Sequence, residues 1–82
     1  MNSNERQVYK DIKMDNPLLA QKFADCLEYA QYGWQEDARD FSGDAFSNAI
    51  QRQPCCNDLD AYLSHNPQLL RRAKACINKH KP

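Results

Sequence analysis

Apolar residues recur at helical spacing most continuously in the stretch 16–34. The stripe consists of Leu19, Phe23, Cys26, Leu27 and Ala30, which follow one another at intervals of four, three, one and three residues. These intervals place the side chains on one face of an α-helix. Asn16 is a favoured N-cap, Pro17 suits the first helical position, and Gly33 is typical of a C-cap. The pattern therefore predicts a helix that begins after Asn16 and ends near Gly33.

A second stripe starts with the same Asn-Pro pair, fifty residues later, at Asn66-Pro67. Its members on one helical face are Leu69, Leu70, Ala73, Cys76, Ile77 and His80. The spacing predicts a final helix over residues 68–81, with a short tail at 81–82.

Each Asn-Pro pair is preceded by a shorter apolar pattern. Val8, Tyr9 and Ile12 indicate a first helix over 5–14. It would follow a frayed polar start at 1–4, and Ser3 or Asn4 would cap it. A short helix capped by Asn57 or Asp58 is indicated by Leu59, Tyr62 and Leu63. Because the links are short, the helices of each pair are predicted to be antiparallel neighbours.

The segment between the two pairs, 34–53, contains Ser42-Gly43-Asp44, which favours a break. We expect a short helix at about 34–41 and another at about 44–53, although one continuous helix also fits the spacing. The second helix would direct Ala45, Phe46, Ala49 and Ile50 inward.

Composition agrees with helices throughout. The 82 residues include one Val, three Ile and no Thr, so the β-branched residues that favour strands are almost missing. The chain is long enough for one domain with a small core. We therefore predict an all-α fold, a compact bundle of four to five short helices in a single domain over 1–82.

The net charge of zero hides an asymmetry along the chain. Residues 1–65 hold six Lys/Arg and eleven Asp/Glu, a balance of −5, whereas residues 66–82 hold five Lys/Arg and no acid, a balance of +5. Such polarity favours electrostatic docking on another protein or on a second copy of the chain. Nucleic-acid binding by the basic helix 68–81 is an alternative, which the acidic remainder disfavours.

The first ten residues are polar, and no apolar run approaches the roughly 18 residues that span a bilayer. We therefore expect a cytoplasmic protein without membrane contact, whose cysteines are thiols.

The four cysteines permit two further interpretations. Cys76 and His80 are four residues apart on one helical face and could bind zinc with further ligands from Cys55, Cys56 or His65, but no paired-Cys knuckle is present. Disulfides are the other alternative. The stretch PCCNDLDAYL…NP…AKACIN, residues 54–78, resembles the middle of plant lipid-transfer proteins, which are secreted four-helix lipid binders. The chain lacks that family's early and C-terminal Cys pairs, so the resemblance stays local and assigns no family.

No converging set of catalytic groups emerges, so we expect neither an enzyme nor a bound cofactor. Tyr29 and Tyr32 lie off the apolar stripe of their helix, and Trp34 follows Gly33. Tyr, Trp and Arg often anchor protein interfaces. The sequence thus predicts a protein-interaction module (an adaptor, inhibitor or regulatory subunit) whose partner-binding residues are Tyr29, Tyr32, Trp34, Arg71, Arg72 and Lys74. A nucleic-acid-binding regulator and a zinc- or disulfide-stapled module are the alternatives.

Overall fold

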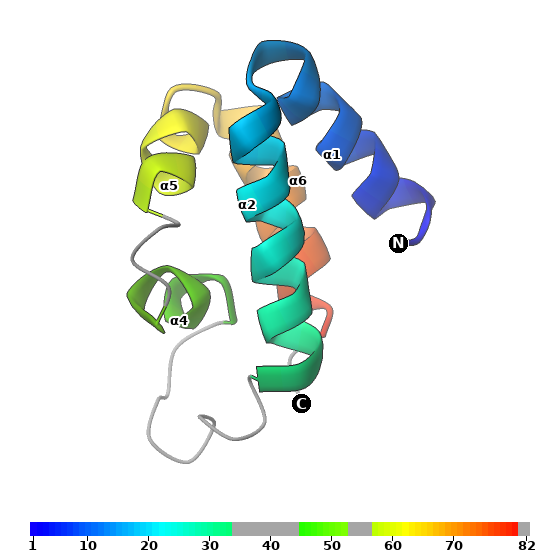
Figure 1. Cartoon of the computed structure of the whole chain (residues 1–82), viewed down its shortest axis with the longest axis vertical. Helices are drawn as coiled ribbons and strands as arrows, with labels where there is room; N and C mark the ends of the chain where they lie inside the picture. The colour runs from blue at the N-terminus through cyan, green and yellow to red at the C-terminus, as the bar shows by residue number, and fades with distance from the viewer. Residues whose placement is uncertain (34–44, 53–56, 81–82) are drawn as a thin grey trace.

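Two helical hairpins, each turning at an Asn-Pro pair, make up most of the fold (Figure 1). The computed structural model describes residues 1–33, 45–52 and 57–80. The first hairpin joins α1 (Ser3–Asp15) to α2 (Pro17–Glu28), which continues into a π-helical turn, η1 (Tyr29–Gly33). The second joins α5 (Asn57–Ser64) to α6 (Pro67–Asn78), and α4 (Ala45–Arg52) lies between the hairpins in sequence.

An asparagine caps the second helix of each hairpin. The Asn16 side chain accepts hydrogen bonds from the backbone N–H groups of Leu18, at 3.0 Å, and Leu19, at 3.4 Å. Asn66 accepts one from the N–H of Leu69 at 3.2 Å. Pro17 and Pro67 follow as the first helical residues, where the missing proline N–H costs nothing. The predicted Asn-Pro caps are confirmed.

The core lies between α2 and α6, which run side by side with α1 on one flank and α4 and α5 on the other (Figure 1). Every helix contributes buried apolar side chains, and among the largest that are fully buried are Phe23, Ile12, Leu59, Leu63 and Ile77. Each such burial is worth roughly 1.5–3 kcal/mol relative to exposure in water. The predicted all-α class is confirmed, and the residues described include no strand.

The N-terminal boundary differs from the prediction. Helix α1 begins at Ser3, and its N-cap is Asn2 rather than Ser3 or Asn4. Asn2 Oδ1 accepts from the N–H of Glu5 at 2.9 Å, and the Glu5 carboxylate accepts from the N–H of Asn2 at 3.3 Å. This reciprocal capping box orders a segment whose polar composition had suggested fraying.

The other boundaries show smaller differences. The helical region from Pro17 reaches Gly33 as expected, but its last five residues form the π turn η1 rather than an α-helix. Helix α6 ends at Asn78, before the predicted residue 81. In α4, Ala45, Phe46 and Ala49 are buried as predicted. The helix predicted at 34–41 lies outside the described residues. Among those that are described, no helix is both long and apolar enough to cross a membrane.

Candidate functional site: a groove between α1 and α6

A groove of about 400 Å³ separates α1 from α6. From the first helix and its cap, the lining residues are Asn2, Asn4, Gln7 and Val8. From the last helix and its end, they are Arg72, Ala75, Cys76 and Lys79. The base is apolar, because Val8 is 1% exposed and Cys76 7% exposed. The rim carries amides and two cations, a combination that can hold an apolar group and orient a polar one.

An ion pair bounds the groove at one end. Arg72 Nη1 lies 2.9 Å from Asp11 Oδ2, and Gln7 Nε2 donates to Asp11 Oδ1 at 3.0 Å. Asp11 therefore links Gln7, one turn earlier on α1, to Arg72 on α6. Both members of the pair are partly exposed, so the contact fixes the position of α1 more than it stabilises the fold.

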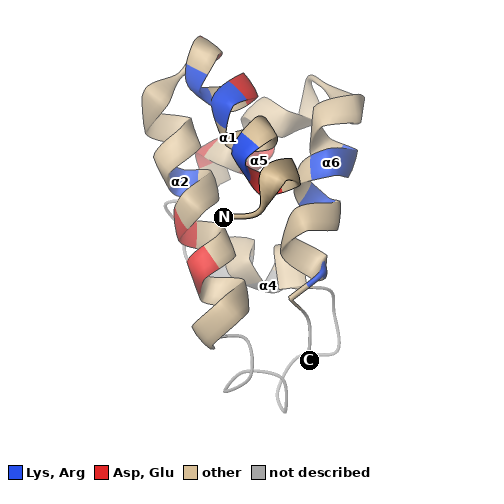
Figure 2. Ribbon diagram, turned by 90° about the vertical axis from the view of Figure 1, so that its right-hand side faces the viewer, with Lys and Arg blue, Asp and Glu red and all other residues tan. Residues whose placement is uncertain are grey.

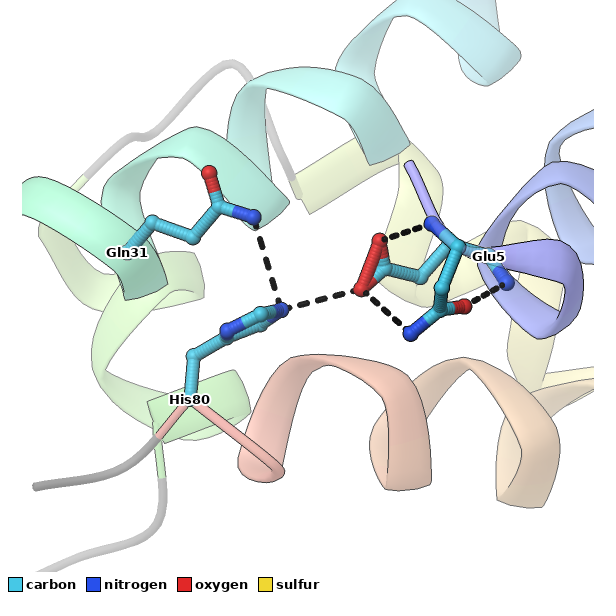
Figure 3. A network of polar contacts seen from close by, with 4 residues as sticks. Glu5, Gln31 and His80 are labelled. Atoms are coloured by element: carbon cyan, nitrogen blue, oxygen red, sulfur yellow. Dashed lines mark hydrogen bonds and ion pairs between the residues drawn. The ribbon is translucent and has the colours of Figure 1, made fainter.

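A polar network bounds the other end (Figure 3). The Glu5 side chain is only 2% exposed, yet its carboxylate is fully engaged. It accepts from Asn2 Nδ2 at 3.2 Å and from His80 Nε2 at 2.9 Å, in addition to the backbone N–H of Asn2. A buried carboxylate is tolerated when hydrogen bonds and a positive partner satisfy it. The network therefore ties the start of α1 to the residue that follows α6.

The same network reaches η1. Gln31 Nε2 lies 3.5 Å from His80 Nε2. Because His80 Nε2–H donates to the Glu5 carboxylate, this nitrogen cannot also accept a hydrogen bond from Gln31. The Gln31 amide is consistent with the network when its oxygen faces the histidine ring. One histidine thus lies between the ends of the first, second and last helical segments (Figure 3).

The thiol at the base of the groove is kept protonated. Burial raises the pKa of the Cys76 thiol, and the nearby Glu5 carboxylate raises it further, while Arg72 and Lys79 partly offset these effects. Reactive cysteines instead have a lowered pKa and sit in exposed, electropositive surroundings. Cys76 is a free thiol that acts as an apolar part of the base.

The two tyrosines of the predicted aromatic surface differ in their exposure to solvent. Tyr32 is 75% exposed, whereas Tyr29 is partly buried and packs against the core. Trp34 lies outside the described residues. Neither tyrosine is among the described residues that line the groove.

The predicted cationic residues of α6 are divided as well. Arg72 lines the groove and pairs with Asp11. Lys74 points toward α4, with its ammonium 5.5 Å from the centre of the Phe46 ring. Arg71 is exposed and forms no ion pair with the described residues. Of the five predicted partner-binding residues that the structure describes, Arg72 lines the groove, and Tyr29, Tyr32, Arg71 and Lys74 do not.

The zinc alternative is only partly covered by the structure. Cys55 and Cys56 lie outside the described residues. In the described ranges, no group of three or more His, Cys, Asp or Glu side chains is arranged to hold a metal ion. His80, the proposed partner of Cys76, directs Nε2 at Glu5.

Sequence reasoning missed the residues that shape the groove, above all Asn2, Glu5 and Asp11. A signal for two of them was present, because Asn2 and Glu5 stand three residues apart, which is the spacing of a capping box. The contact between Glu5 and His80 joins residues 75 positions apart, and no local pattern predicts it.

Neither a family model, nor a curated protein, nor a solved structure matches the chain. The function has to be argued from the chemistry of the site itself.

Proposed function

We propose that this chain is a small helical protein-interaction module, acting as an adaptor, inhibitor or regulatory subunit, which docks its partners at the α1–α6 groove. The observation that carries the proposal is a concave surface with an apolar base and a polar rim, bounded by two polar contacts between helices. Its volume is near the small end of the roughly 300–1,000 Å³ typical of ligand pockets. It suits a few side chains of a protein segment better than a large cofactor.

The architecture supports this proposal over catalysis. The thiol in the groove has a raised pKa, and the histidine next to it is committed to a buried carboxylate. A nucleophile needs an activated form and a base that is available to it. A buried free thiol also accords with the reducing cytoplasm that the sequence led us to expect.

A substitution that fills the groove tests the proposal. Ala75 is exposed and lines the groove, so Ala75→Trp places a large ring there without removing a core side chain. Gln68→Trp, at an exposed position on the same helix outside the groove, is the matched control. Affinity capture from the native source with each immobilised variant, followed by mass spectrometry, compares the partners retained.

The proposal predicts that specific partners are captured by the native chain and by Gln68→Trp but are lost with Ala75→Trp, while circular dichroism shows equal helicity. Equal capture by both variants would contradict the groove as the docking surface. A Tyr32→Ala variant extends the comparison, because loss of capture in that variant alone would move the surface to the exposed side chain of η1.

Nucleic-acid binding by residues 68–81 is supported less well. Two of the cations on α6 are occupied within the fold, Arg72 by Asp11 and Lys74 by the Phe46 ring. Phosphate contacts would have to compete with these interactions. A gel-shift series that shows no retardation even at low salt would exclude this alternative.

A further inference from the structure

Across α1 and α6, the two helices that flank the groove, basic residues outnumber acidic ones, and each acidic group of α1 already makes a polar contact. Glu5 is buried in the network with Asn2 and His80, and Asp11 is paired with Arg72. Asp15 accepts a 2.6 Å hydrogen bond from the Tyr62 hydroxyl. Helix α6 contains no acidic residue.

Several cations of α1, of α6 and of the residue after α6 are available for a further ion pair, and Lys79 among them lines the groove. Arg6, Lys10, Arg71 and Lys79 are exposed and form no ion pair within the described part of the chain. Figure 2 shows Lys and Arg segments without acidic ones on α6, whereas α1 and α2 each carry both basic and acidic segments. A surface with this distribution attracts negatively charged groups and repels positive ones.

We infer that the groove selects an acidic peptide segment, in which a carboxylate pairs with Lys79 and an adjacent apolar side chain packs over Val8 and Cys76. This inference rests on the proposed function and specifies the chemistry of the partner. Among the described residues that line the groove, Lys79 is the cation without an ion pair, and the amides of Asn4 and Gln7 on the opposite wall can bond to a peptide backbone.

A peptide fits the lining better than a nucleic acid does. Two buried, apolar side chains form the base, and none of the described residues that line the groove is aromatic. Proteins that bind single strands use aromatic side chains on which bases stack, together with cations that track the backbone. The described lining of the groove offers positive charge but no ring on which a base could stack. An acidic peptide with an apolar side chain can contact both the polar rim and the apolar base of the groove.

Three fluorescein-labelled libraries of short peptides provide the test. They share the same randomised apolar residues, and their remaining positions are filled with Asp/Glu, with Asn/Gln or with Lys/Arg. Fluorescence polarisation against the native chain at low salt should show binding of the acidic library at protein concentrations about tenfold lower than for the neutral library, a difference that corresponds to about 1.4 kcal/mol. The basic library should show no binding.

Two variants assign this preference to the groove. Lys79→Gln should weaken binding of the acidic library severalfold and leave the neutral library unchanged, and Ala75→Trp should abolish both. The matched control is Lys13→Gln, because Lys13 lies over the ring of Tyr9, outside the groove lining. It should bind as the native chain does.

The outcomes separate this inference from the proposed function. Equal binding of the acidic and neutral libraries, abolished by Ala75→Trp, would overturn the acidic preference and leave the groove as a docking site. Binding that Ala75→Trp does not affect, or no binding of any library, would overturn both. Tighter binding of a fluorescein-labelled oligothymidine, or a dimer in sedimentation velocity that Ala75→Trp dissociates, would overturn the acidic peptide in favour of nucleic acid or a second copy.

Discussion

Helices α1 and α2 belong to one hairpin, yet they are held in the fold by different means. Helix α2 buries five residues, all of them apolar, and contacts each of the other α-helices in the described part of the chain. Helix α1 buries three, one of which is the carboxylate-bearing Glu5. Each acidic side chain of α1 makes a contact outside its own helix, with His80, Arg72 or Tyr62.

The difference shows how a bundle of this size can keep a groove open. Apolar packing draws helices together until no space remains, as around α2. Directional polar contacts fix two helices at a set separation without filling the space between them. The groove lies along the side of α1 that faces α6, between two such contacts. Four substitutions test this difference between α1 and α2, with expected effects that decrease from the core to the surface.

The largest effect should come from the apolar side of the comparison. Phe23 is fully buried on α2, and Phe23→Ala should reduce the free energy of unfolding by about 3–5 kcal/mol because it leaves a cavity in the core. Urea denaturation followed by circular dichroism measures the change. Phe23→Leu serves as the conservative control and should retain most of the stability. A loss below about 1 kcal/mol for the alanine variant would mean that α2 is not the centre of the core.

The next effect concerns the buried network. Glu5→Ala removes the capping box and leaves His80 without its partner, which should cost about 1–3 kcal/mol of unfolding free energy. A double-mutant cycle with His80→Ala isolates the contact between the two side chains. A coupling energy indistinguishable from zero would show that Glu5 acts only within its own helix.

A smaller loss of stability should come from removing the hydrogen bond between Tyr62 and Asp15, which joins the two hairpins, and this loss should depend on pH. Burial, together with the hydrogen bond to Asp15 and the negative charge there, raises the pKa of Tyr62 from 10.0 to about 12. The folded state thus favours the protonated phenol, so the stabilisation is complete below pH 10 and is lost as pH rises from 10 toward 12.

Tyr62→Phe removes this hydrogen bond and should cost about 0.5–1 kcal/mol near neutral pH, since the pair is close to the surface. The stability difference between the native chain and the variant should shrink above pH 10. Denaturation curves at neutral and alkaline pH measure it, and absorbance titration should show that the variant lacks a late phenol ionisation. A constant difference across this range would contradict the pKa assignment.

The smallest change in stability should follow from Arg72→Gln. The Asp11 pair is partly exposed, and such pairs contribute roughly 0.2–1 kcal/mol. The substitution nevertheless leaves the Asp11 carboxylate unpaired beside the groove, so binding of acidic peptides should weaken more than stability does. Arg71→Gln, an exposed neighbour outside the lining, is the control. Equal effects of both variants on binding would mean that only overall charge matters.

The sequence predicted the parts of the fold that depend on local chemistry. The stripe from Leu19 to Ala30 and the caps at Asn16 and Asn66 were found because helical spacing and capping involve residues a few positions apart. The π turn at Tyr29–Gly33 was missed, since the same apolar spacing serves a continuous α-helix. The groove was missed for a different reason. It depends on where α1 lies against α6, and this is set by contacts such as Asp11 to Arg72 that join distant parts of the chain.

The turn at Asn16 has a further consequence for how the chain can vary in length. The N–H of Asn16 bonds to the Ile12 carbonyl at the end of α1, while its side chain caps the start of α2. With no loop to absorb a change, one extra residue near this position would turn the following stripe by about 100° around the helix axis. An alanine inserted after Asp15 should therefore abolish cooperative thermal unfolding, whereas exchanges of exposed residues nearby should be tolerated. At this corner, we expect the number of residues to be constrained as well as the identity of the capping Asn16.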